Sequence, residues 1–490
     1  MKHFGKTHFF LLLFICIQIK AQDTLHLSLS ETVQLAQQNS PEAIAARHTF
    51  RAAYWNWRSY RATLLPGITL SSDPLLNRSI SSVTLPDGKD SYVRRDQLSI
   101  DMGITINQNI LFTGGSLFIQ SALERLDLLS ENTISYKTSP VIIGYKQDLF
   151  GYNKLKWDKK IEPVRYTEAK KSLVETVELV AARVTYYFFQ LATAQTNFEI
   201  ASYNFANADT LYQFAQGRYN IGTITENEML QLELNLLTEQ TNLMNARIEV
   251  EDYNQVLRSY LGINDATFLK LTISDGIPSI VVPETQALSL AYMHNPEPET
   301  IKRKRIESES DLALAKSQRG FKAELYMQFG LTQKDQTLKQ AYHDPLDQQL
   351  VSLGIRIPVL DWGVGKGKIK VALSNRDKVY TELEQQQIDF ELNVLKIVRQ
   401  FNIQAGKVIL AKKTDDTAQR RCEVAHRLYL LGKSIILDLN ASVAEKDRAR
   451  RAYITALYNY WNLYYAIRSL TGYDFEKDRE LTENFEQLIL

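Results

Sequence analysis

The sequence contains almost no cysteine, with only Cys16 and Cys422 among its 490 residues. Cys16 lies in an apolar segment close to the first residue, which we interpret below as an export signal. If that segment is removed, one cysteine remains, and a single cysteine cannot form an internal disulfide bond. Disulfide stapling, on which small exported domains often depend, is therefore excluded as the source of stability.

Neither sign of charge dominates, because 57 Lys and Arg residues balance 56 Asp and Glu residues and leave a formal net charge of +1. The overall charge therefore does not mark a nucleic-acid-binding protein. After the first segment there is also no apolar run of the roughly 20 residues that a transmembrane helix needs. The sequence thus predicts no membrane-spanning helix.

Recognisable catalytic patterns are missing as well. The seven histidines are isolated, and no two of them have the H-x-x-x-H spacing of a zinc-binding helix. We therefore predict no catalytic residues, no metal site and no cofactor. An exported enzyme on a helical scaffold stays open as a hypothesis, but no site in the sequence supports it.

The first 21 residues have the features of a secretion signal. Lys2 and Lys6 precede the apolar run Phe9–Ile19, and Ala21 offers a small residue at a cleavage site before Gln22. The predicted signal peptide is 1–21. An exported chain without a membrane-spanning helix is either soluble or crosses an outer membrane as a β-barrel.

Two long segments carry apolar residues at alternating spacings of four and three, which is the pattern of helices packed knobs-into-holes. In the first segment the pattern runs from Leu173 to Ala215, and in the second from Phe390 to Tyr429. A helix over about 161–217 would be roughly 85 Å long at 1.5 Å per residue, which no compact domain needs.

The second segment repeats the first at an offset of 210 residues. This shift places Ala201 on Ala411, and it also places Gly222 on Gly432. The agreement of helix register and glycine position under one offset predicts a tandem duplication. Earlier helical segments match at an offset of 255, so the first copy should carry about 45 extra residues between its first and second long helices.

Alternating segments between these helices predict β-strands. Leu98–Ile106 and Val351–Val359 alternate apolar and mostly polar residues, with partner strands expected near 68–70 and 323–332. The extra residues of the first copy fall on 118–128 and 141–150, and the sequence leaves open whether these pair as an added hairpin. A sheet with so few strands cannot close alone in a membrane, so closure requires several chains.

These patterns divide the chain into consecutive regions. The predicted regions are the signal peptide 1–21, a first-repeat helix 22–65, first-repeat barrel strands 66–150, a first long helical hairpin 151–282, a second-repeat helix 283–320, second-repeat barrel strands 321–362, a second long helical hairpin 363–470, and a C-terminal tail 471–490. The predicted fold class is mostly α with membrane β-hairpins.

Over essentially all of the chain after the signal, this layout resembles the TolC family of outer-membrane efflux channels. The family's hairpin tips carry glycine turns, and the matching stretches here are Tyr219, Asn220, Ile221, Gly222 and Thr223, and Tyr429, Leu430, Leu431, Gly432 and Lys433. The resemblance implies a homotrimer with duplicated coiled-coil hairpins and a shared β-barrel in outer-membrane lipid. It also implies that the tips dock onto a periplasmic adaptor, served by an inner-membrane pump of RND or ABC type.

The resemblance further implies a constriction near the tips, lined by acidic residues. Asp438 matches the first acidic position of that pattern, Ala441 stands at the second, and Glu228 is the counterpart of Asp438 in the first copy. Three copies of Asp438 would form a carboxylate ring favouring cations. A solvated surface role for either acid is the alternative. For Asp415, at a heptad core position, we expect a water-facing side chain rather than a paired one.

The predicted function is a passive conduit in the outer membrane, extending into the periplasm, for substrates passed on by a pump and an adaptor. The alternative is a periplasmic adaptor, since adaptors also use helical hairpins. Two hairpins and membrane-like strands favour the channel. Neither the exported substrate nor the class of pump follows from the sequence.

Overall fold

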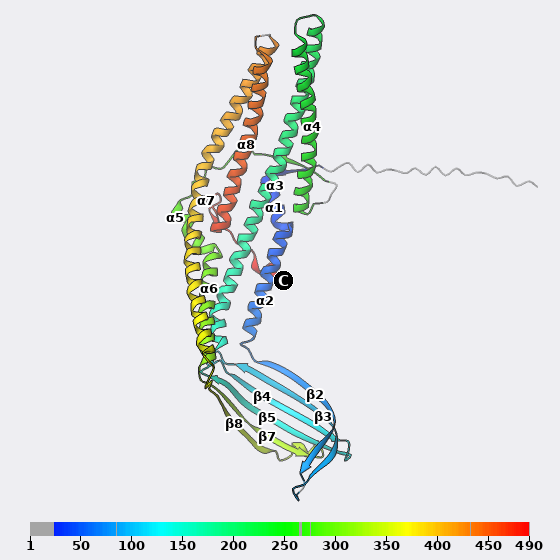
Figure 1. The fold of residues 1–490 in the computed structure, drawn as a ribbon, viewed down its shortest axis with the longest axis vertical. Coiled ribbons are helices and arrows are strands. Elements are labelled where there is room, and N and C mark those ends of the chain that lie inside the picture. Colours follow the sequence, from blue (N-terminus) through cyan, green and yellow to red (C-terminus); the bar gives the residue numbers. More distant parts are fainter. Residues whose placement is uncertain (1–23, 85, 264–266, 275, 432, 490) are drawn as a thin grey trace, which may run out of the picture.

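A computed structural model describes residues 24–84, 86–263, 267–274, 276–431 and 433–489. The molecule is elongated, with two long helical hairpins at one end and a curved sheet at the other (Figure 1). The predicted signal peptide and Gly432 lie outside the described residues.

The helices confirm the duplication predicted from the heptads. In the first copy α1 (Leu29–Asn39) and α2 (Pro41–Ala62) precede the long hairpin of α3 (Lys154–Asn220) and α4 (Glu226–Leu261). In the second copy α5 (Glu284–His294) and α6 (Glu297–Arg319) precede α7 (Val364–Leu430) and α8 (Ile436–Thr471).

The two long hairpins have the same dimensions. Both α3 and α7 have 67 residues, both α4 and α8 have 36, and every end of the second hairpin lies 210 residues after its counterpart. No helix in the described part of the chain is both long and apolar enough to cross a membrane. We call α3–α4 the first hairpin and α7–α8 the second hairpin.

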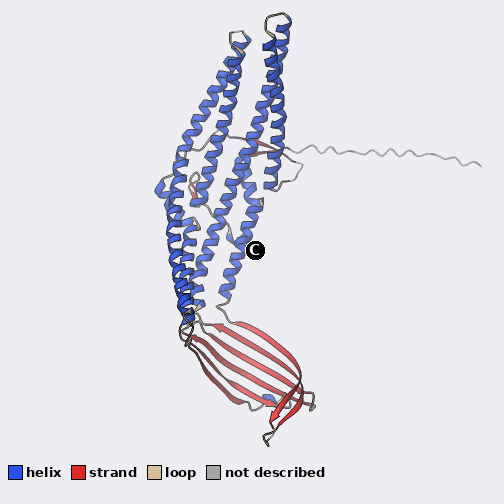
Figure 2. Cartoon of the chain, in the orientation of Figure 1, coloured by secondary structure: helices blue, strands red, loops and turns tan. Residues whose placement is uncertain are grey.

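The sheet has six antiparallel strands in the order β2-β3-β4-β5-β7-β8 (Figure 2). They span Gly67–Thr84, Asp90–Asn109, Ser116–Leu128, Thr133–Leu149, Lys322–Asp335 and Leu346–Arg356. The first copy therefore supplies four strands and the second copy two, which answers the open question: β4 and β5 pair as an added hairpin. The last strand begins and ends earlier than the alternation predicts: β8 ends at Arg356, before Pro358, which has no N–H to donate.

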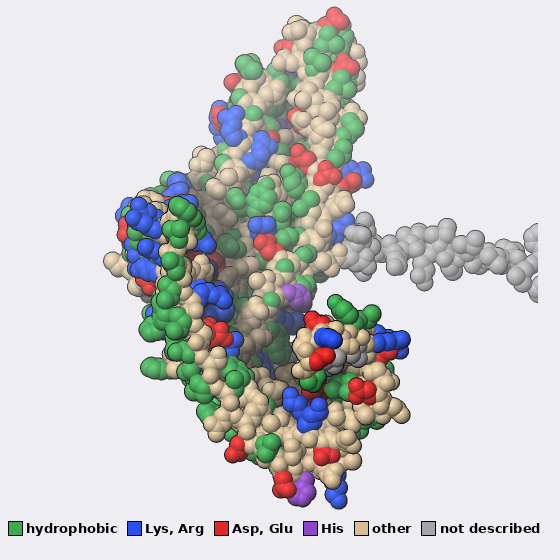
Figure 3. Space-filling view, turned by 60° about the horizontal axis from the view of Figure 1, so that its bottom comes forward, with side chains coloured by type: hydrophobic (Ala, Val, Ile, Leu, Met, Phe, Trp, Pro, Cys, Tyr) green, Lys and Arg blue, Asp and Glu red, His purple; other side chains and the backbone are tan. Residues whose placement is uncertain are grey.

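The sheet has one apolar and one polar face. Ile68 pairs with Ile106 and Leu70 with Ile104 on one face, whereas Thr69 pairs with Thr105 on the other. The apolar side chains are uncovered, with Ile68 73% and Leu70 68% exposed. Figure 3, which brings the sheet end forward, shows hydrophobic side chains gathered along the left side of the molecule. An uncovered apolar face of this kind is typical of a lipid-facing sheet.

The helical core lies where the bases of the hairpins meet the short helices. Val180, Leu191, Leu257, Tyr453 and Leu457 are among its buried side chains. A parallel pair of short strands, β1 (Thr24–Ser28) and β6 (Phe268–Thr272), lies beside this core.

A buried ion cluster joins the two hairpins at the same level. Arg468 of α8 donates to both carboxylate oxygens of Glu178 of α3, at 2.8 and 3.0 Å, and to Asp474 at 2.9 Å. Asp474 belongs to β9 (Tyr473–Asp474), which pairs with β10 (Arg479–Glu480) in the C-terminal segment before α9 (Phe485–Ile489). The Arg468 cluster therefore fixes α3, α8 and the C-terminal segment to one another.

Candidate functional site: the hairpin tips and the cleft between the hairpins

The first tip, residues 219–223, is a tight turn built on glycine. Gly222 has a φ of +77°, in the left-handed region that favours glycine. Its N–H donates to the carbonyl of Tyr219 at 2.9 Å, and the N–H of Thr223 donates to the carbonyl of Arg218 at 2.9 Å. These bonds satisfy carbonyls that the end of α3 would otherwise leave unpaired.

The second tip, residues 429–433, closes with the same hydrogen bond. The N–H of Lys433 donates to the carbonyl of Leu428 at 2.9 Å, and both residues lie 210 positions after Thr223 and Arg218. Gly432, the residue that we predict to form this turn, lies outside the described residues. The two tips therefore share a backbone turn, as the duplication predicts.

The helices that leave the two tips begin differently. Thr225 caps α4, and its side chain and the Glu228 carboxylate form a reciprocal capping box. The Thr225 N–H donates to Glu228 at 2.9 Å, and this bond together with the Thr225 hydroxyl lowers the pKa of Glu228 below its usual range. The corresponding residue before α8 is Ile435, which has no side-chain oxygen and makes no capping bond.

Asp438 therefore has more freedom than Glu228, although both occupy the third position of their helices. Asp438 is exposed, and among the described residues its carboxylate accepts a side-chain hydrogen bond only from the Ser434 hydroxyl, at 3.3 Å. Glu228 is exposed too, but its carboxylate is engaged by Thr225. The two acids occupy equivalent positions in the duplicated sequence, but their hydrogen bonding differs in the structure.

The surfaces of the two tips also differ in polarity. Around the second tip Leu430, Leu431, Ile435 and Leu437 are 55–67% exposed. Around the first tip Ile221 is 75% and Tyr219 39% exposed, beside the exposed polar residues Asn220 and Thr223. We call the four aliphatic residues of the second tip the apolar tip patch.

Just inside the tips, the two hairpins meet in a small apolar cluster of Leu211, Ala215, Leu232 and Leu439. Tyr429 packs against this cluster, and burial raises the pKa of its hydroxyl. The charges of Arg218 and Glu228 also act on Tyr429, so a residue of the second tip lies close to the first hairpin.

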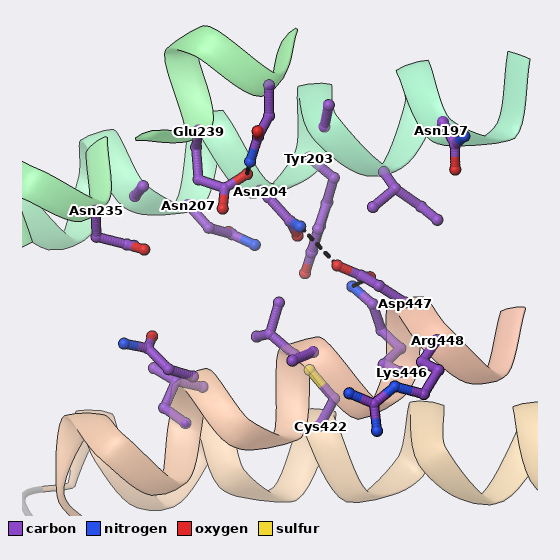
Figure 4. A pocket seen from close by; sticks show the side chains of 18 of the residues that line it. Asn197, Tyr203, Asn204, Asn207, Asn235, Glu239, Cys422, Lys446, Asp447 and Arg448 are labelled. Carbon is purple, nitrogen blue, oxygen red and sulfur yellow. Dashed lines mark hydrogen bonds and ion pairs between the residues drawn. The ribbon is translucent and has the colours of Figure 1, made fainter. Parts of the chain in front are cut away.

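Further along the hairpins a cleft of about 920 Å³ opens between them (Figure 4). Amide side chains line much of it, with six asparagines on the first hairpin: Asn197, Asn204, Asn207, Asn235, Asn242 and Asn245. Asn204 donates to Asp447 of α8 at 2.8 Å, and the Lys446 ammonium lies 3.3 Å from the other oxygen of Asp447. Asp447 is only 6% exposed, so this bond is a buried polar link between the hairpins.

The sequence analysis did not find this link. Asn197 and Asn204 are seven residues apart, a spacing that places them on one helix face, but only the three-dimensional structure brings Asp447 opposite them. The expectation for Asp415 is wrong: it is 5% exposed and accepts a hydrogen bond from Arg450 at 3.1 Å. A carboxylate at a heptad core position is tolerated there because its partner comes from the adjacent helix α8.

No group of three or more His, Cys, Asp or Glu side chains that could hold a metal ion occurs among the described residues. The candidate site is thus a set of surfaces, namely two tips and an amide-lined cleft.

Duplicated helical hairpins rising from an antiparallel sheet define a class of protein, the outer-membrane channels. Solved structures of this class share the fold at low sequence identity. The CmeC outer membrane channel of Campylobacter jejuni matches with a TM-score of 0.67 and 15% identity, covering 94% of this chain and 88% of that one.

Two further channels match in the same way. The outer membrane protein VceC of Vibrio cholerae gives a TM-score of 0.63 at 12% identity, with 91% of this chain and 96% of that one covered. The open state of the MtrE outer membrane channel of Neisseria gonorrhoeae gives a TM-score of 0.60 at 13% identity. The match covers 93% of this chain and 91% of that one. A search of the curated proteins finds no significant match.

The model of the outer membrane efflux protein family matches residues 32–263 and 315–473. The chain belongs to the outer membrane efflux protein family. It is an outer-membrane channel of efflux systems, located in the outer membrane, and the alternative of a periplasmic adaptor is wrong. The resemblance to the TolC family is confirmed.

Proposed function

We propose that the protein is a homotrimeric, passive conduit in which three copies share one β-barrel. The observation that carries the proposal is the pair of matched hairpins attached to a sheet whose apolar face is uncovered. Within the described residues β2 and β8 each have one neighbouring strand, so two edges are left to pair. In lipid an open edge leaves backbone groups unsatisfied, and pairing β2 of one copy with β8 of the next removes both edges.

The strand directions support this closure. An antiparallel sheet with an even number of strands has edges that run in opposite directions, so the edge contact between copies is antiparallel like all the others. Three symmetry-related copies then form a closed ring with one repeated interface. Because it performs no chemistry, such a conduit obtains the free energy for transport from its partners.

We propose that both tips dock onto a periplasmic adaptor, which links the channel to an inner-membrane pump of RND or ABC type. The apolar tip patch supports docking at the second tip, because exposed aliphatic side chains clustered around a turn are typical of an interaction site. The first tip would contribute polar contacts through Asn220 and Thr223. Lys433 beside the patch adds a positive charge to the second tip.

Crosslinking tests the docking proposal. In cells, a cysteine at Thr223 or Lys433 in a Cys422→Ser background should crosslink to one periplasmic protein. The control is a cysteine at Asp252, which is also exposed but lies near the base of α4. Crosslinks from neither tip, or equal crosslinks from Asp252, would contradict docking at the tips.

We further propose that Asp438 contributes to a constriction of the tunnel, and that Glu228 does so less. Asp438 is exposed, and its one side-chain hydrogen-bond partner within the described part of the chain is Ser434, whereas the capping box holds Glu228. Replacing Asp438 with Asn removes three carboxylates from the trimer, so the cation selectivity of single channels should fall. Glu228→Gln is the matched control and should leave selectivity nearly unchanged. Unchanged selectivity in Asp438→Asn would contradict a place for Asp438 in the constriction, and equal losses from both substitutions would contradict the ranking of the two acids.

A further inference from the structure

The added hairpin β4–β5 occupies the middle of the sheet. Pairing runs from β3 to β4 and from β5 to β7, so the hairpin lies between the strands of the first copy and those of the second. Each copy otherwise contributes one equivalent hairpin, β2–β3 or β7–β8. Without the insertion, the strand order would be that of a simple duplicated sheet.

The insertion is packed into the sheet and is not a loose flap. The ring of Phe118 on β4 lies over Gly144 on β5, where an added Cβ would come within 2.0 Å of it. The same ring stacks on Tyr326 of β7 at a centroid distance of 5.9 Å. Lys146 of β5 pairs with Glu324 of β7 at 2.9 Å. These contacts join β4 and β5 to a strand of the second copy.

The base of the insertion is also tied to the helical part. The Asn153 side chain caps α3 by accepting from Lys156 at 2.9 Å, and its amide donates to the carbonyl of Leu111 at 3.3 Å in the turn between β3 and β4. That turn is thus attached to the start of α3, and the position of the inserted hairpin relative to the tunnel is fixed.

Toward the helical end of the sheet the two faces continue across the inserted strands, whereas farther along Arg125 lies opposite Ile100 and Asp127 opposite Leu98. On the apolar face Ile106 pairs with Ile119, and Ile119 pairs with Ile143. On the polar face Thr105 pairs with Gln120, and Asp101 with Glu124. Membrane barrels place apolar side chains toward lipid and polar side chains toward the lumen. The insertion therefore has the pattern of a piece of the barrel wall.

We infer that the membrane pore closes from eighteen strands, six from each protomer, and that the inserted hairpin sets its width. This inference rests on the proposed trimer. With strands about 4.8 Å apart and tilted by about 40°, eighteen strands give a backbone diameter of about 36 Å, against about 24 Å for twelve. The exit through the membrane then admits cargo too bulky for the narrower barrel. Size selection is left to the helical tunnel.

A deletion of residues 110–149 removes the hairpin and joins the end of β3 to the residues that precede α3. The strand order becomes β2-β3-β7-β8, and because an even number of strands is removed, β3 and β7 become antiparallel neighbours. The shortened chain keeps an even number of strands and both original edges. It is therefore expected to form a trimer with twelve strands.

Cysteine labelling in intact cells measures the width. Thr105→Cys places one thiol on the polar face of β3, in a Cys422→Ser background, and maleimide-polyethylene glycols of graded size are added outside. Inward side chains take about 5 Å from each wall, which leaves openings of about 26 Å and about 14 Å. The largest reagent that reacts with the full-length chain should therefore have about twice the diameter of the largest that reacts with the shortened chain. Asp87→Cys, in the turn between β2 and β3, is the control and should react with every size in both chains.

Trimer formation is measured in parallel by chemical crosslinking of the purified proteins. If both chains form trimers and the same size limit applies to both, the eighteen-strand inference is overturned. If the full-length chain forms no trimer, the proposed function itself fails. If only the shortened chain fails to form a trimer, the width is read from the full-length chain alone, where a size limit below about 20 Å contradicts the inference.

Discussion

The two hairpins have identical lengths and different ends. Both have helices of 67 and 36 residues and the same hydrogen bond across the turn. One begins its second helix with a Thr225–Glu228 capping box, and the other has Ile435 at that position and an apolar tip patch. Heptad packing constrains length and register along the whole helix, whereas a tip residue contacts few neighbours. The helices have therefore kept the same lengths while the turns diverged, so the two tips expose different side chains.

The largest expected effect is a loss of stability at the bases of the hairpins, where the Arg468 cluster joins α3 to α8. Arg468→Met leaves the buried Glu178 and Asp474 carboxylates without their partner, which should cost about 3–5 kcal/mol. The measurement is the thermal unfolding of the purified protein. Arg448→Met, an exposed arginine on the same helix, is the control and should change stability little. Similar losses from both would mean that the cluster does not hold the hairpins together.

A smaller, pH-dependent effect is expected at Asp474 in the same cluster. Burial alone would raise the pKa of Asp474, but the hydrogen bond from Tyr464 and the charge of Arg468 lower it below the ordinary value. Because the pKa of Asp474 is lower in the folded than in the unfolded state, its carboxylate stabilises the fold at pH values above the unfolded-state pKa of about 3.9. This contribution is lost as the pH falls through the folded-state pKa. Asp474→Asn should therefore cost about 2 kcal/mol at pH 7.

The cost of Asp474→Asn should stay constant down to about pH 4 and shrink below it. Melting temperatures of both proteins across pH 3–8 measure the difference. A difference that grows at acidic pH would contradict the role assigned to the Asp474 carboxylate.

The smallest effect is expected at the tips, where exchanging the caps tests the contrast directly. Thr225→Ala removes the cap of α4 and should destabilise its first turn by about 1 kcal/mol. Ile435→Thr should stabilise the first turn of α8 by a similar amount, because Asp438 then stands at the third position of a new capping pair. Hydrogen exchange of the amides in the two first turns measures both changes. If Ile435→Thr does not slow amide exchange in the first turn of α8, the missing cap does not limit the stability of that turn.

Much of the fold was predictable because it repeats. The heptads from Leu173 and from Phe390, with the shared offset of Gly222 and Gly432, predicted two matched hairpins, and the ends of the observed hairpins share that offset. The strands were predicted from alternation, but the pairing of 118–128 with 141–150 was not. The same alternating pattern is compatible with several orders of the strands in the sheet. Asp415 was misjudged because its partner, Arg450, lies on another helix.

The sequence by itself determined the local structures and their duplication, since helical and strand periodicities are properties of neighbouring residues. The tertiary structure alone decided where the added hairpin joins the sheet, which acid at the tips is held in a capping box, and that Asn204 meets Asp447 across the cleft. Each of these depends on contacts between residues far apart in the chain, and such contacts leave no periodic pattern in a single sequence.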